Sequence, residues 1–366
     1  MKKLFISLLS LVALFALVGC NLQSGDTIKF TSLPQPVYTQ GYDEATFKQE
    51  VKIMLNTTET TLAQAEGLSD VVISGLDLET VGSHTLVIVY KSVSLTYNYQ
   101  VVASNAVTKV STLSELTAAL EAQDKVIELI SDLKGLTDKV EINYALTIYG
   151  NGHTIEVVSG DRAVNVNGVK EGTVAFYDLN IRLTSGAYAS RGLNFAQCED
   201  IEVIIDNTSV YNKLYYAINI TGSVKDITLT VKNGSTAGGY CAINCWATDS
   251  TINVYDSTLN GDNVHGKGDD NNFAVVVISS NSVTNGKNNS MIFDNVTLNA
   301  TSQYGNIENI LIIQGRDGNI ASGNSVKFNN CTFNKAVHDG VEHDFMFIVS
   351  TGESLPEVLI NGESIK

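Results

Sequence analysis

The chain has 366 residues, of which 23 are Lys or Arg and 39 are Asp or Glu, which gives a formal net charge of −16. Such an acidic chain is a poor partner for nucleic acids and other polyanions, because like charges repel. The sequence shows no cluster of Lys and Arg that would form a local basic patch. We therefore expect no nucleic-acid partner, and sugar ligands that are mostly neutral.

Residues 1–20, MKKLFISLLSLVALFALVGC, begin with two lysines and continue as an apolar run that ends at Gly19 and Cys20. This pattern indicates an export signal rather than a membrane span. The ending LVGC resembles the lipobox of bacterial lipoproteins, which implies that Cys20 is acylated and becomes the first residue of the mature chain. Two or more acyl chains hold a protein stably on a bilayer. The resemblance implies an extracytoplasmic protein anchored to the membrane surface, with an ordinary cleaved signal as the alternative.

Residues 21–104 alternate apolar and polar residues between turn signals, as in "TLVIVYKSVSLTYNYQVV", which predicts an antiparallel β-sandwich. The stretches "LPQPVYTQGYD", "ISGLDLETVGSHTLVIVY" and "YNYQVV" resemble bacterial immunoglobulin-like modules. The resemblance implies a spacer or an adhesive unit on a cell surface. It supplies no catalytic residue.

Residues 105–366 open with "VSTLSELTAALEAQD", which predicts one short amphipathic helix. Leu113, Leu116 and Leu120 share one face of it, and Thr112 with Glu115 forms a capping box at its start. The rest of the region is rich in Val, Ile, Thr, Asn and Gly and has no further helical pattern. We expect it to be all-β.

A repeated spacing in this region places an Asp or Asn four positions after an apolar residue. The repeat starts at Val174, Val203, Leu229, Ile252, Met291 and Val326. The Asp or Asn is Asp178, Asn207, Asn233, Asp256, Asn295 and Asn330 in turn. Asn and Asp tolerate the left-handed backbone conformation best after glycine, so each predicts a sharp bend between two strands. Stacked side chains would bond from one bend to the next.

An apolar-x-apolar pair follows each repeat and predicts a further strand. The pairs are Leu193/Phe195, Ile218/Ile220, Ile243/Cys245, Val275/Val277, Leu311/Ile313 and Phe347/Val349, and Val164/Val166 precedes the first repeat. Each period is therefore strand, bend, strand, loop and strand. This is one coil of a right-handed parallel β-helix, with coils about 4.8 Å apart.

The start of this region resembles the pectate-lyase-like β-helix superfamily. The resemblance lies in "VSTLSELTAALEAQDKVIELISDLKG", which implies a capping helix, and in the turn of "ALTIYGNGHTIEV". It implies the fold and not the chemistry, because the superfamily includes lyases, hydrolases, tailspikes and adhesins. The implied fold class is all-β, with an immunoglobulin-like sandwich followed by a right-handed parallel β-helix.

The middle residue of each apolar pair points away from the core and predicts a binding face. These residues are Asn165, Asn194, Asn219 and Asn244, followed by Val276, Ile312 and Ile348. We expect an exposed column of amides that bonds sugar hydroxyls, beside aromatic rings on which sugars stack. The rings are Tyr188, Tyr215, Tyr216, Tyr240, Tyr304 and Trp246. The alternative is an asparagine column that only stabilises the stack.

Catalysis is the second hypothesis for the function, after carbohydrate binding or adhesion at the cell surface. A glycoside hydrolase needs two carboxyl groups several ångströms apart, and the candidates in the long loops are Asp262, Asp269, Asp270, Asp339 and Asp344. The first three are also an alternative calcium site, although we expect no cofactor. The order of His265 and the acidic residues differs from that in polygalacturonases. The face also lacks the carboxylate and arginine set that pectate lyases need.

Four cysteines follow Cys20. Cys245 and Cys331 fall on inward-facing positions, and Cys241 is placed on the same face as Cys245. Four strand residues span about 13 Å, which is beyond the reach of a disulfide. We expect these three to be free core residues, whereas Cys198 lies in a loop and remains open.

Overall fold

The computed structural model describes residues 26–32, 34–35, 37–103, 106–187, 189–263, 273–302, 308–316, 318–335, 337–338, 341–342, 345–348 and 356–365. The chain divides into two compact units between Val101 and Val102. The predicted export signal and Cys20 lie outside the described residues. Each unit has its own hydrophobic core.

The first unit contains two sheets and two short helices. In the described part of the chain, the smaller sheet has the order β1 (Ile28–Ser32), β3 (Lys52–Leu55), β4 (Thr58–Thr61). The larger has the order β2 (Val37–Thr39), β7 (Val93–Val102), β6 (Gly82–Tyr90), β5 (Val71–Ser74). The pairings of β1 with β3, β3 with β4, β5 with β6 and β6 with β7 are antiparallel, as the alternating pattern predicts.

Helices α1 (Glu44–Glu50) and α2 (Leu62–Ala65) were not expected from the alternating pattern. The side chain of Asp43 accepts a hydrogen bond from the backbone of Thr46 and caps α1, and Thr61 forms a capping box that starts α2. Each helix buries a large apolar side chain, Phe47 and Leu62 respectively, in the same core as both sheets. Their capping residues are the signal that indicates these helices in the sequence.

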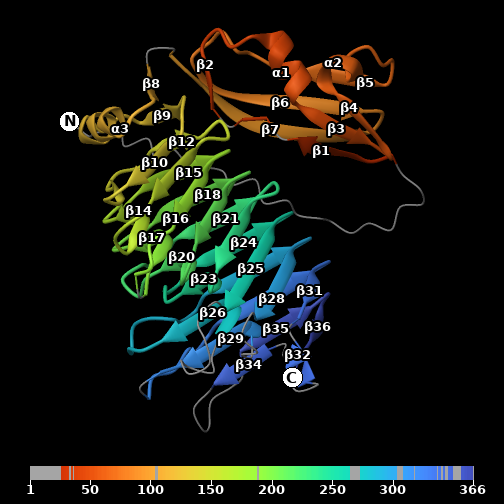
Figure 1. Cartoon of the computed structure of the whole chain (residues 1–366). Coiled ribbons are helices and arrows are strands. Elements are labelled where there is room, and N and C mark those ends of the chain that lie inside the picture. Colours follow the sequence, from red (N-terminus) through yellow and green to blue (C-terminus); the bar gives the residue numbers. More distant parts are fainter. Residues whose placement is uncertain are drawn as a thin grey trace, which may run out of the picture. The chain divides into compact units, whose positions relative to one another are not determined.

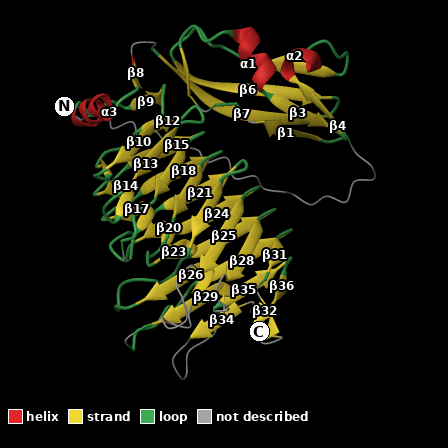
Figure 2. Cartoon of the chain, in the orientation of Figure 1, coloured by secondary structure: helices red, strands yellow, loops and turns green. Residues whose placement is uncertain are grey.

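The second unit is built from three long parallel sheets (Figures 1 and 2). Over the described residues, sheet I has eight strands in the order β10 (Leu133–Leu136), β13 (Thr154–Val157), β16 (Asn180–Leu183), β19 (Ser209–Asn212), β22 (Thr236–Gly239), β25 (Thr258–Asn263), β28 (Thr297–Ser302), β31 (Thr332–Asn334). Sheet II, counted in the same way, has eight strands in the order β11 (Val140–Ile142), β14 (Arg162–Asn167), β17 (Arg191–Ala196), β20 (Tyr216–Ile220), β23 (Cys241–Cys245), β26 (Phe273–Ser280), β29 (Glu308–Gly315), β34 (Phe345–Ile348).

Sheet III has eleven strands within the described ranges. Its order is β36 (Glu363–Ser364), β35 (Glu357–Ile360), β30 (Ser325–Asn329), β27 (Ser290–Asp294), β24 (Thr251–Tyr255), β21 (Thr228–Lys232), β18 (Ile201–Asp206), β15 (Gly172–Tyr177), β12 (Thr147–Tyr149), β9 (Val126–Leu129), β8 (Val107–Val110). Its strands pair in parallel within the described ranges, except that β36 folds back antiparallel onto β35. A separate hairpin joins β32 (Val337–His338) to β33 (Val341–Glu342).

The chain visits the three sheets in a fixed order, from sheet III to sheet I to sheet II and back to sheet III. Each circuit adds one strand to every sheet, an arrangement consistent with a β-helix. Inward-facing side chains from all three sheets fill a single core. In one circuit, Phe176 of sheet III, Ile181 of sheet I and Leu193 of sheet II are fully buried.

Helix α3 (Leu113–Glu121) begins at Thr112 with the predicted capping box, in which Thr112 and Glu115 bond each other's backbone. Leu116 is fully buried in the core of the second unit, and Leu120 packs against that core. Leu113 is 43% exposed, so the apolar face of the helix is only partly covered.

The bends between sheet III and sheet I hold the six repeat residues in one column. Asp178, Asn207, Asn233, Asp256, Asn295 and Asn330 have φ between 44° and 58°. Amide side chains bond back to the preceding coil: Asn207 donates to Asp178 (3.1 Å), Asn233 to Asp206 (2.7 Å), Asn295 to Asp256 (2.6 Å) and Asn330 to Asp294 (3.2 Å). In each of these pairs the acceptor is a carboxylate, which has no proton to donate.

A second column of bends, which the sequence analysis missed, joins sheet II to sheet III. Asp200, Asp226, Asp249 and Asn288 have φ between 51° and 55°. They stand three positions before the apolar residue that starts each repeat. An Asp or Asn at that position is the feature of the sequence that indicates these bends.

The four described cysteines are free. Cys245 is fully buried in the core, and burial raises the pKa of its thiol to about 12. Cys198 is also fully buried in that core, which settles the position left open above. Cys241 is buried in a different cluster, with Tyr215 and Tyr240, so its predicted placement on the face of Cys245 was wrong.

Candidate functional site

The candidate site is the outer face of sheet II together with the connections that enter it from sheet I. The connections start where β16, β19, β22, β25, β28 and β31 end and lead into the next strand of sheet II. Because both sheets are parallel and in register, the ends of these sheet I strands and the starts of the sheet II strands line up along one edge of the unit. Residues 264–272 and 303–307, which belong to two of the connections, lie outside the described residues.

The asparagine column on sheet II is buried, and the prediction that it is exposed was wrong. Asn165, Asn194, Asn219 and Asn244 are between 0% and 4% exposed. Each amide nitrogen donates to the side-chain oxygen of the preceding coil, at 2.6 Å from Asn194, 2.6 Å from Asn219 and 2.7 Å from Asn244. Stacked copies of one side chain cover one another, and the amides hydrogen-bond within the stack.

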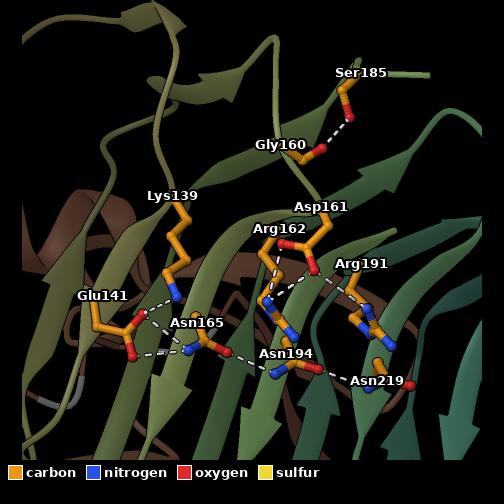
Figure 3. A network of polar contacts seen from close by, with 10 residues as sticks. All are labelled: Lys139, Glu141, Gly160, Asp161, Arg162, Asn165, Ser185, Arg191, Asn194 and Asn219. Atoms are coloured by element: carbon orange, nitrogen blue, oxygen red, sulfur yellow. Dashed lines mark hydrogen bonds and ion pairs between the residues drawn. The ribbon is translucent and has the colours of Figure 1, made fainter. Parts of the chain in front are cut away.

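Glu141 ends this amide ladder, which we define as Glu141, Asn165, Asn194, Asn219 and Asn244. Figure 3 shows the ladder from Glu141 to Asn219. Both carboxylate oxygens of Glu141 accept from Asn165, at 2.8 and 2.9 Å, and Lys139 lies 2.9 Å away. Burial raises the pKa of Glu141, but the hydrogen bonds from Asn165 and Lys139 outweigh it and leave the pKa below its usual value. The ladder thus favours the charged carboxylate, which is an acceptor only.

The column continues beyond Asn244 with apolar residues, in a register that differs from the predicted one. The residues opposite one another are Asn244, Val277, Ile312 and Met346. Val276 belongs to the inward-facing set instead, because the pair Val275/Val277 was assigned one position away from its true register. Phe347/Val349 was assigned two positions away, whereas Leu311/Ile313 and the outward-facing Ile312 are confirmed. Val277 is 6% exposed and Ile312 is fully buried.

Two of the predicted aromatic residues are accessible and two are not. Tyr216 and Trp246 are half-buried, and the guanidinium of Arg316 lies 5.7 Å from the centre of the Trp246 ring. Tyr240 is only 4% exposed and packs with Tyr215, so neither offers a face to a sugar. Tyr188 and Tyr304 lie outside the described residues.

A local basic group, which the sequence analysis did not anticipate, lies beside the ladder (Figure 3). Arg162 and Arg191 are opposite each other on β14 and β17, and both approach the carboxylate of Asp161. The signal in the sequence is the recurrence of Arg-x-x-Asn in "RAVN" and "RGLN" at the same phase of the repeat. The two arginines are 29 positions apart in the chain and become neighbours only when it coils.

Of the candidate catalytic and calcium-binding carboxylates, the structure describes only Asp262. Asp262 is half-buried at the end of β25, opposite Thr301 of β28. Asp269, Asp270, Asp339 and Asp344 lie outside the described residues. Among the residues that are described, no group of three or more His, Cys, Asp or Glu side chains is placed to hold a metal ion.

Sheet I carries a second, more accessible column of amides. The Asn299 side chain donates to Asn260, and the Asn334 side chain donates to Asn299, both at 2.6 Å. Asn260 and Asn299 are half-buried and Asn334 is exposed. Gly238 takes the next position, between Asn260 and Tyr211. This column provides an internal comparison for the buried ladder of sheet II.

Within the described ranges, no helix is long and apolar enough to cross a membrane. Comparison with known proteins gives no match to a family model, to a curated protein or to a solved structure.

Proposed function

We propose that the protein is an extracytoplasmic lipoprotein, held on the membrane surface through acylated Cys20, that binds carbohydrate with the outer face of sheet II. The proposal also includes the fold family of each of the two units. The second unit would be a right-handed, pectate-lyase-like β-helix, and the first an immunoglobulin-like module that spaces it from the bilayer. The LVGC motif and the opening helix with its capping box support these assignments.

The observation that carries the binding proposal is the composition of the accessible part of this face. Tyr216 and Arg191 are opposite each other on neighbouring strands, and Trp246 follows β23 two coils after Arg191. Aromatic rings stack on the apolar faces of sugars, while charged side chains bond their polar substituents. The buried ladder beside these residues keeps the strands that carry them in fixed positions, because each of its amides is held by its neighbour.

The test uses the mature chain with Cys20→Ser, so that it is soluble, and a panel of neutral and acidic polysaccharides fixed to a resin. We expect retention by at least one polysaccharide, and binding about tenfold weaker for Tyr216→Ala because a central aromatic contact is lost. Tyr211→Ala is the matched control, since Tyr211 is a 37% exposed tyrosine on the outer face of sheet I.

The same incubation distinguishes binding from catalysis. New reducing or unsaturated ends in the supernatant would replace the binding proposal by the hydrolase or lyase hypothesis. If Tyr211→Ala and Tyr216→Ala weaken retention equally, sheet II is not the binding face. No retention by any member of the panel would contradict carbohydrate binding as a whole.

A further inference from the structure

Arg162 and Arg191 form a stacked pair on the outer face of sheet II. They are direct partners in the parallel register of β14 and β17, and the next residue in this column is Tyr216 of β20. Their side chains are 27% and 23% exposed, so each guanidinium is largely removed from water but still reachable. Figure 3 shows both groups beside the amide ladder.

The pair has more donors than the surrounding residues can satisfy. Nη1 of Arg162 donates to Asp161 Oδ1 at 3.0 Å and lies 2.9 Å from Oδ2, whereas Nη1 of Arg191 is 3.6 Å from Oδ2. Nε of both arginines is buried and has no hydrogen-bond partner. Two guanidinium groups offer ten N–H donors, and Asp161 is the one carboxylate that pairs with them in the described structure.

Two positive groups with one carboxylate partner leave a net positive charge that is partly buried. Burial lowers the pKa of the Arg191 guanidinium, and the neighbouring positive charge of Arg162 lowers it further. A buried donor without a partner also costs free energy comparable to a lost hydrogen bond. An additional anionic acceptor at the exposed nitrogens of the two guanidinium groups would relieve the first of these costs, the repulsion between two like charges.

We propose that Arg162 and Arg191 bind the carboxylate of an acidic sugar residue, whose ring lies against Tyr216. The planar guanidinium fork matches a carboxylate, which can accept two parallel hydrogen bonds. The next residue of the column is the uncharged Tyr216, so the arginine pair is the place in this column where an anionic group of the ligand would bind. This inference rests on the proposed carbohydrate function and replaces the expectation of mostly neutral ligands.

The first experiment measures the anion site without a polysaccharide. Thermal unfolding of the Cys20→Ser chain is followed with glucuronate, with its methyl ester and with sodium chloride at equal ionic strength. We expect glucuronate to raise the melting temperature above both references, and we expect this rise to vanish in Arg191→Gln. Arg182→Gln is the control, because Arg182 lies on the outer face of sheet I over the Tyr211 ring at 5.3 Å. It should keep the rise.

The second experiment measures affinity for a uronic-acid oligosaccharide by calorimetry, with its methyl-esterified form as the matched neutral ligand. Loss of one charged fork should weaken binding of the acid about 10- to 100-fold in Arg191→Gln and leave binding of the ester unchanged. Arg191→Lys should recover only part of the loss, because an ammonium group keeps the charge and lacks the fork.

The outcomes separate the two proposals. Equal affinity for acid and ester would overturn the arginine site while leaving carbohydrate binding intact. No effect of glucuronate beyond that of sodium chloride would overturn it as well, whatever the polysaccharide panel shows. An equal loss in Arg182→Gln would show that only the total charge of the protein matters, which also contradicts the proposal.

Discussion

Replacing Asn219 with alanine should lower the free energy of unfolding of the second unit by about 2 to 6 kcal/mol. Asn219 is 3% exposed, donates to Asn194 and accepts from Asn244, so its loss leaves one acceptor and one donor buried without a partner. Each such group costs about 1 to 3 kcal/mol. Urea unfolding of the full chain, followed by circular dichroism, measures the change.

Asn299→Ala is the matched control, since Asn299 also donates to one asparagine and accepts from another. Its column on sheet I is half-buried or exposed, so water replaces the lost partners and we expect a change of about 1 kcal/mol or less. Equal losses in the two variants would show that burial of the sheet II ladder has no energetic importance.

Replacing Asn233 with valine should destabilise the second unit by about 2.5 to 5 kcal/mol. Asn233 has φ of 58°, a conformation that costs a residue with a Cβ branch about 1 to 2 kcal/mol. The substitution also removes the 2.7 Å hydrogen bond to Asp206, which is 7% exposed, and a bond to a charged group contributes about 1.5 to 3 kcal/mol. The same unfolding assay measures the loss.

Asn233→Gly separates the two contributions, because glycine accepts a positive φ without strain but cannot bond Asp206. We expect this variant to be more stable than Asn233→Val by about 1 kcal/mol. A glycine variant as unstable as the valine variant would contradict the assignment of backbone strain to the bend.

The repeat predicts much of this fold because one chemical requirement recurs in every coil. An Asp or Asn stands wherever the backbone turns left-handed between sheets III and I, as at Asp178 and Asn207. The same repeat contains a second bend at Asp200 and Asp226, which the pattern starting at Val174 does not include because these residues lie before the start of each repeat. Capping residues at Asp43 and Thr61 were likewise present but were hidden by the strand-like alternation of their surroundings.

The candidate site was less predictable, because its properties arise between coils. A single outward-facing asparagine is exposed on an isolated strand, but a column of them, such as Asn194 upon Asn165, is buried by its own copies. The local positive charge of the site also arises only in the folded chain. Arg162 and Arg191 are isolated basic residues in an acidic sequence, and coiling makes them a pair.

A crystal structure of the mature chain bound to a uronic-acid oligosaccharide tests the central claim most directly. We expect a sugar on the outer face of sheet II, with its carboxylate about 3 Å from the guanidinium nitrogens of Arg162 and Arg191 and its ring against Tyr216. An oligosaccharide bound to sheet I, to sheet III or to the first unit, with the arginine pair unchanged, would contradict the proposed site.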